Sequence, residues 1–425
     1  MRKNDVSPGP SRRGVRLSRA DAAWLRMEAP TNPMVITALL LFAEPLPMAV
    51  LEAFATARVL GAERFGRRLV PGNGRRARWE PDADFAVRRH LHHVALPHPG
   101  DERQLEDLVS DLMSSPLDTR KPPWEMHLID GFLGGSAVVV RLHHSIADGV
   151  ALVRLMQGGA DAKAPSAAVP ARDGVPEGAL VRGGRAAVTL AHLLALPGEP
   201  ATSLKGPLGA AKRGAWSRPL PLRDFKEIAA RHGVKVGDVF ATIVAGGLRR
   251  YLDARRELAS GLEVRAVVPV NLRRDGEPGS LGNRFGLAFL SLPLGLVSPD
   301  ARLDEVARRT RAIKTSGEAL VTYGVLESMA LVSPAVDELV IRVFEAKATL
   351  VMTTVPGPRA PISIGGRRLQ GVAFWAPQAG RLGLGVSMLS YAGDVRIGVA
   401  SDVKLVAEPA ELVGDIETEL TVLRG

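Results

Sequence analysis

The order of apolar and polar positions predicts strands and helices in both halves of the chain. Short apolar runs that end at turn residues are typical of buried strands. Such runs occur at 34–43, 124–143, 262–272, 286–295, 347–356 and 382–402. Apolar residues that return every three or four positions predict amphipathic helices at 48–70, 101–116, 149–159 and 299–320, and two helices around a Gly turn within 222–255. Because strands and helices are interleaved, we expect an α/β fold.

Turn and capping residues mark several element ends. Ser18 stands where an N-cap is expected for a short helix, which the Pro-containing stretch 30–33 ends. An Asp-Gly and a Gly-Gly step separate two apolar runs within 124–145, so this segment is expected to form a hairpin. We expect a further short strand at 76–81 and a loop with basic residues at 202–222.

The length of 425 residues exceeds the size at which one core usually stops growing, so two domains are expected. Residues 1–17 are basic and poor in apolar side chains, which predicts a flexible tail. Composition changes again over 161–222, where Ala, Pro and Gly predict a linker that contains a helix at 185–200. We expect the remaining residues to form an N-terminal domain over 18–160 and a C-terminal domain over 223–425.

Composition narrows the possible partners. The chain has no cysteine, which excludes disulfides, thiolate metal sites and a cysteine nucleophile. Its net charge of +10 suits phosphate-bearing ligands or an anionic membrane surface. Only 4% of residues are aromatic and no motif interleaves them with basic residues, so we expect no nucleic-acid binding.

The start of the chain does not read as a secretory signal, because no apolar segment directly follows its basic residues. The apolar run 34–43 has about half of the roughly 20 residues that a membrane crossing needs. We therefore expect a cytoplasmic protein, with peripheral contact at the inner membrane surface or lipid inclusions as its route to lipid.

The stretch VVVRLHHSIADGV (138–150) places His143 and His144 together where a strand is expected to end. One explanation is structural. Ser145 and Asp148 have the spacing of a capping box, in which a serine and an acid three residues later satisfy free N–H groups at a helix start. This explanation accounts for Ser145 and Asp148 but not for two adjacent histidines.

A metal site is the second explanation. The pair lacks the i, i+4 histidine spacing and the intervening glutamate of a zinc-binding helix. Three further histidines, His90, His92 and His93, have arginines around them and no adjacent carboxylate, and strand alternation would divide them between two faces. We therefore expect no metal site.

General-base catalysis is the third explanation. Successive strand residues face opposite sides, so only one of His143 and His144 can point into a cleft. An imidazole that titrates near neutrality can take a proton from a hydroxyl and return it to a leaving group. Asp148 could hold the loop by pairing with a distant arginine, and Gly149 would let backbone or substrate approach closely. No G-x-S-x-G nucleophile motif is present.

The histidine stretch also carries a resemblance. HHSIADG matches the HHxxxDG motif of the CoA-dependent acyltransferase superfamily, which includes chloramphenicol acetyltransferase and the condensation domains of nonribosomal peptide synthetases. Further phrases follow in the order seen in bacterial wax ester synthase/diacylglycerol acyltransferases: LSRADAAWLRMEAPTNPM, KPPWEMHLIDG, LKGPLGAAKRGAWS, VGDVFATIVAGGLRRYL, VPVNLRR with LGNRFG, TTVPGP and SYAGDVRIGVASD. The resemblance covers nearly the whole chain after residue 17.

The resemblance implies two similar chloramphenicol-acetyltransferase-like α/β domains, each with a mixed sheet flanked by helices, joined by a crossover linker. A tunnel between them would admit acyl-CoA and an alcohol from opposite sides. His144 would be the general base that deprotonates a long-chain alcohol or diacylglycerol, with His143 supporting it. Asp148 and Gly149 would be architectural. No cofactor or metal is implied, since acyl-CoA is a co-substrate.

Three departures from the family pattern lie outside the histidine motif: Pro123 replaces leucine, and Gly237 and Thr354 replace asparagines. We expect these replacements to affect loop geometry and substrate preference, and to leave the chemistry unchanged.

Five residues are weaker candidates for substrate binding: Trp124, Asp238, Asn283, Pro356 and Gly357. Each also has a structural explanation. The tryptophan suits a core, the aspartate a helix start, and the other three suit turns.

The sequence thus predicts an acyl-CoA-dependent O-acyltransferase that makes triacylglycerol, wax ester or both. Two alternatives remain open. One is an acyltransferase for a small molecule or a carrier-protein substrate, because condensation domains share the histidine motif. The other is a non-catalytic lipid-binding homologue, because the family asparagines are altered.

Overall fold

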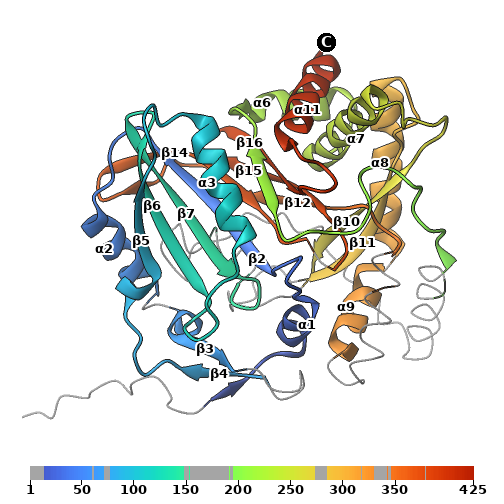
Figure 1. Ribbon diagram of the computed structural model, residues 1–425. Helices are drawn as coiled ribbons and strands as arrows, with labels where there is room; N and C mark the ends of the chain where they lie inside the picture. The colour runs from blue at the N-terminus through green and yellow to red at the C-terminus, as the bar shows by residue number, and fades with distance from the viewer. Residues whose placement is uncertain are drawn as a thin grey trace, which may run out of the picture.

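Two mixed sheets lie side by side, with helices between them and over their outer faces (Figure 1). The structure is a computed structural model of the chain. The model describes residues 14–59, 62–70, 77–147, 153, 191, 195–272, 285–316, 318–329, 342, 346–378 and 380–425. The helices expected at 149–159 and 185–200 fall almost entirely outside these residues.

The first sheet has six described strands in the order β13-β14-β2-β7-β6-β5. Their bounds are β2 (Val35–Phe42), β5 (Leu91–Ala95), β6 (Trp124–Phe132), β7 (Gly135–His143), β13 (Ser363–Ile364) and β14 (Arg367–Trp375). Strands β6 and β7 form the expected hairpin, and β5 is parallel to β6 while the other neighbours are antiparallel.

The second sheet has seven described strands in the order β11-β10-β12-β15-β16-β8, with β9 also paired to β16. Their bounds are β8 (Lys212–Trp216), β9 (Leu220–Pro221), β10 (Val264–Asn271), β11 (Phe285–Leu292), β12 (Leu350–Pro356), β15 (Leu384–Tyr391) and β16 (Asp394–Asp402). Parallel pairs at β10–β12 and β12–β15 make this sheet mixed as well, which confirms the expected fold class.

Eight helices and one small sheet complete the described part of the chain. The helices are α1 (Arg19–Met27), α2 (Met48–Val59), α3 (Glu102–Ser114), α6 (Leu222–Arg231), α7 (Val236–Ala254), α8 (Pro299–Ser316), α9 (Glu318–Met329) and α11 (Pro409–Arg424), with 3₁₀ turns at Glu63–Gly66 and Val87–His90. The small sheet joins β1 (Val15–Arg16), β4 (Arg78–Pro81) and β3 (Arg67–Val70). The side chain of Ser18 caps α1, as expected, by accepting from the Asp21 N–H at 3.1 Å.

Helix α3 lies between the two sheets (Figure 1) and joins their cores. Its buried Leu105 and Val109 pack with Val139 of β7, Trp375 of β14 and Ala400 of β16. Helices α6, α7 and α11 supply much of the second sheet's own core. The two sheets therefore share a packed junction, to which α3, β7, β14 and β16 all contribute.

Three predictions of local structure were wrong. The helix expected over 48–70 ends at Val59, because 67–70 forms β3 and pairs with β4. The loop expected over 202–222 contains β8 and β9, whose polar residues are paired inside the fold: the amine of Lys212 lies 2.7 Å from a carboxylate oxygen of Asp402. The expected single helix over 299–320 is divided into α8 and α9.

Candidate active site at the histidine pair

His143 and His144 stand at the end of β7, where backbone bonds from two directions fix them. The His143 N–H donates to the Pro123 carbonyl at 2.9 Å, and the His144 N–H donates to the Met34 carbonyl at 2.7 Å. These partners precede β6 and β2, so the pair is fixed by the starts of both neighbouring strands. Both side chains are buried, with 2% and 7% of their surface exposed.

The ring of His143 is held through Nδ1, and its Nε2 faces Glu28. Its Nδ1 accepts from the Ser145 N–H at 3.1 Å and lies 2.6 Å from the Ser145 hydroxyl. Because a backbone N–H can only donate, the ring proton is assigned to Nε2, which lies 3.5 Å from a carboxylate oxygen of Glu28. The hydrogen bond with His143 lowers the pKa of Glu28, and the Met34 backbone adds to this effect. A ring fixed in this way suits a supporting role.

The ring of His144 lies among aromatic side chains from both halves of the chain. It stacks on Trp24 of α1 with 4.7 Å between ring centroids, and Phe285 of β11 lies 5.8 Å away. Trp24 and Phe285 also touch each other, at 5.3 Å. Trp24 packs with Met34 and other apolar residues, so the imidazole sits in a largely apolar environment at the junction. Such an environment excludes competing water from a proton transfer.

Arg64 ties the loop after the histidines to helix α1. One guanidinium nitrogen lies 3.0 Å from a carboxylate oxygen of the fully buried Asp21. Another donates to the carbonyls of Ser145 at 3.0 Å and Ile146 at 3.4 Å. Helix α1 also carries Trp24, so the same contact fixes the loop and the stacking ring relative to each other. Nothing in the local sequence around Arg64 indicates this role.

Comparison with known proteins decides the family. Two family models match: the wax ester synthase/diacylglycerol acyltransferase (WS/DGAT) catalytic domain at residues 17–216, and the WS/DGAT C-terminal domain at 281–424. The chain belongs to the WS/DGAT family. A probable diacylglycerol O-acyltransferase of Mycobacterium tuberculosis strain H37Rv is 30% identical, and the match covers 94% of each chain.

Solved structures agree on the fold. The WS/DGAT of Marinobacter aquaeolei VT8 has a TM-score of 0.71 at 23% identity, covering 96% of this chain and 98% of its own. The first condensation domain of the calcium-dependent antibiotic synthetase has a TM-score of 0.65 at 17% identity, covering 98% and 96%. These matches confirm the resemblance and the two-domain acyltransferase fold inferred from the sequence.

Two weaker candidates of this WS/DGAT chain make structural contacts. Trp124 is buried, donates its indole N–H to the Phe65 carbonyl at 2.8 Å and stacks on His90 with 4.3 Å between centroids. Asp238 lies in the first turn of α7, where its carboxylate accepts from the Lys235 N–H at 2.9 Å. These contacts are the ones expected if Trp124 belongs to the core and Asp238 stabilises the start of a helix.

The remaining candidates are divided between turns and undescribed segments. Pro356 ends β12, and Gly357 approaches β15 so closely that a Cβ there would lie 2.1 Å from the Ser390 carbonyl oxygen. Asn283, Asp148 and Gly149 lie outside the described residues, and so does the capping box that would involve Asp148.

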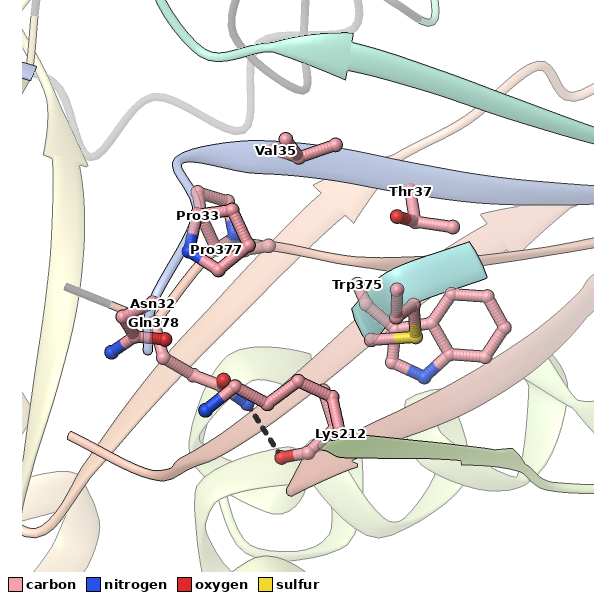
Figure 2. Close-up of a pocket in the computed structure, with 11 residues that line it drawn as sticks. Asn32, Pro33, Val35, Thr37, Lys212, Trp375, Pro377 and Gln378 are labelled. Atoms are coloured by element: carbon pink, nitrogen blue, oxygen red, sulfur yellow. Dashed lines mark hydrogen bonds between the residues drawn. The ribbon is translucent and has the colours of Figure 1, made fainter. Parts of the chain in front are cut away.

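A small pocket lies at the junction of the sheets, between the start of β2, β8 and the segment after β14 (Figure 2). Its empty volume is about 340 Å³, which includes open solvent. Two of its polar side chains already bond to protein: Asn32 donates to the Gly380 and Leu382 carbonyls at 2.9 Å, and Gln378 donates to the Ala400 carbonyl at 2.7 Å. Neither histidine lines this pocket, so we do not assign it to the substrate.

A group of potential metal ligands lies on β5 and β6. Within the described part of the chain, His92, Glu125 and His127 bring donor atoms together.

None of the described helices has the length and apolar character that crossing a membrane requires.

Proposed function

We propose that this WS/DGAT protein transfers a long-chain acyl group from acyl-CoA to diacylglycerol, to a fatty alcohol, or to both. The observation that carries the proposal is the placement of His144, which is buried at the junction of the two halves between Trp24 and Phe285. The relative named as a diacylglycerol O-acyltransferase supports the acceptor class.

In the proposed mechanism, His144 is the general base. Its imidazole takes the proton from the acceptor hydroxyl, and the oxygen attacks the thioester carbonyl of acyl-CoA. The C–S bond then breaks, and the imidazolium returns the proton to the departing CoA sulfur. A thioester is already activated, so positioning and exclusion of water complete the requirements. His143, fixed by Ser145 and Glu28, keeps the end of β7 in place.

The charge of the chain supports a route to the substrates. A net charge of +10 favours the phosphates of CoA and the anionic surface of a membrane or lipid inclusion. We propose peripheral contact with such a surface, from which the acceptor lipid would enter.

The test measures free CoA released from a long-chain acyl-CoA in the presence of diacylglycerol or a fatty alcohol, with product identity checked by chromatography. A thiol reagent reports CoA directly, because the protein contributes no cysteine. His144→Ala should lower turnover by at least about 100-fold. His93→Ala is the matched control, since His93 is half-exposed on β5 and pairs with Asp130.

Full turnover by His144→Ala would show that the base is another residue. A second candidate function is transfer from a carrier-protein thioester, which the condensation-domain fold favours. An acyl-phosphopantetheine carrier protein added to the acceptor panel separates the two, because the proposed enzyme should use acyl-CoA in preference. Lipid binding without CoA release from any donor would instead support a non-catalytic homologue.

A further inference from the structure

Three potential metal ligands share one face of the first sheet, at its β5 edge. Strands β5 and β6 are parallel, and their register places His92 directly beside His127. Glu125 precedes His127 by two residues on β6, so its side chain points to the same face. His93, the next residue on β5, faces the other way and bonds to Asp130 at 2.7 Å.

The donor atoms are close enough for one ion. The Nε2 of His127 lies 3.1 Å from one carboxylate oxygen of Glu125, and the Nε2 of His92 lies 3.8 Å from the other. The two imidazole rings are 4.6 Å apart between centroids, and one donor atom from each residue lies within 4.8 Å of the others. Ligands of a tetrahedral zinc ion lie about 3.3 Å apart, so the donor atoms would have to move closer and the two stacked rings would have to turn toward the ion.

One of the three donor groups has a free ligand atom. The Nε2 of His92 is buried and has no hydrogen-bond partner among the described residues. Glu125 accepts hydrogen bonds from His127 and Arg141, and a bound ion would replace the proton that His127 now shares with it.

We propose that His92, Glu125 and His127 bind a divalent transition-metal ion such as Zn²⁺, with water completing its coordination. Two imidazoles and one carboxylate form a common zinc donor set, whereas Mg²⁺ and Ca²⁺ prefer oxygen ligands. The proposal departs from our expectation of no metal site. That expectation considered the histidines of 90–93 only with their neighbours in sequence, while two of the ligands come from the adjacent strand.

Arg141 sets the strength of the site. Its buried guanidinium donates to one oxygen of Glu125 and to the Ser115 carbonyl, which leaves the other Glu125 oxygen facing His92. The guanidinium charge opposes a second cation, so binding should be weaker than at a closed four-ligand site. A bound ion would join the edge strand β5 to β6. It would share no ligand with His144, so the proposal is independent of the acyl-transfer mechanism.

The test titrates chelator-treated, tag-free protein with Co²⁺, whose visible absorption reports tetrahedral nitrogen and oxygen coordination, and then displaces Co²⁺ with Zn²⁺. We expect one equivalent to bind. His92→Ala and His127→Ala should each weaken binding by at least about tenfold, and His93→Ala should bind like the parent. His92 is partly exposed, so its alanine variant is expected to fold, which circular dichroism verifies.

Two results would overturn the proposal. The first is that folded His92→Ala binds Co²⁺ with the same affinity as the parent, or that neither protein binds Co²⁺ measurably. The other is an equal loss of affinity in His93→Ala, which would indicate a surface histidine effect. Neither result depends on acyl-transfer activity.

Discussion

Replacing Trp24 by leucine removes the ring on which the His144 imidazole stacks, at 4.7 Å between centroids. Trp24 is 5% exposed, and leucine would keep an apolar side chain there without an aromatic face. The substitution leaves His144 and its backbone bond to Met34 intact. We therefore expect the imidazole to spend less time in its reactive orientation.

The contact sets the size of the effect. An aromatic pair contributes about 0.5–1.5 kcal/mol beyond its buried area. Since about 1.4 kcal/mol corresponds to a tenfold change in rate, loss of this contact should lower kcat by about 2- to 13-fold. Trp24 also loses its contact with Phe285, at 5.3 Å, so the free energy of unfolding should fall by about 2 kcal/mol. The KM for acyl-CoA should change little.

The assay is the rate of CoA release at saturating acyl-CoA, measured with a thiol reagent alongside urea unfolding. Trp24→Phe is the control, because it keeps an aromatic ring against His144. The reasoning would be refuted if Trp24→Leu lost stability as expected but kept the parental kcat. It would also fail if Trp24→Phe were as slow as Trp24→Leu, since volume rather than stacking would then matter.

Three further substitutions test other parts of the structure. Burial raises the pKa of Glu318 from 4.5 to about 7. The stability that Glu318 contributes is therefore complete below pH 4.5 and is lost as the pH rises through 7. In urea unfolding, Glu318→Gln should gain about 3 kcal/mol of stability relative to the parent between pH 4.5 and 8. Gly357→Ala should cost about 1–3 kcal/mol by calorimetry, because its Cβ would meet the Ser390 carbonyl; lost activity at unchanged stability would instead indicate substrate contact. Arg64→Ala should lower kcat by about 10- to 100-fold by freeing the loop from Asp21, and an unchanged kcat would contradict that role.

Local patterns predicted the elements that carry the histidines. The hairpin of β6 and β7, the cap at Ser18 and the helices α6 and α7 each follow from residues close in sequence. Strand β8 was missed because its lysine and arginine indicated a loop, whereas the lysine is paired with Asp402 from a distant strand.

Contacts between distant segments could not be predicted in this way. The bond from Arg64 to Ser145 spans 81 positions, and neither residue has a sequence signal that links it to the other. The stacking of Trp24 and Phe285 on His144 depends on how the two sheets meet. The metal ligands are an intermediate case: Glu125 and His127 alternate on a strand that was predicted, but the register with β5 was not.

The position of β14 determines whether the two halves of the chain can be expressed separately. This strand belongs to the C-terminal half of the chain, yet it pairs with β2 in the sheet that ends at His143. A fragment truncated before residue 363 would expose the backbone edge of β2 along most of its length, and such an edge recruits other strands and aggregates. Separate expression of the histidine-bearing half should therefore give soluble material only when a peptide spanning 363–375 is supplied to complement it.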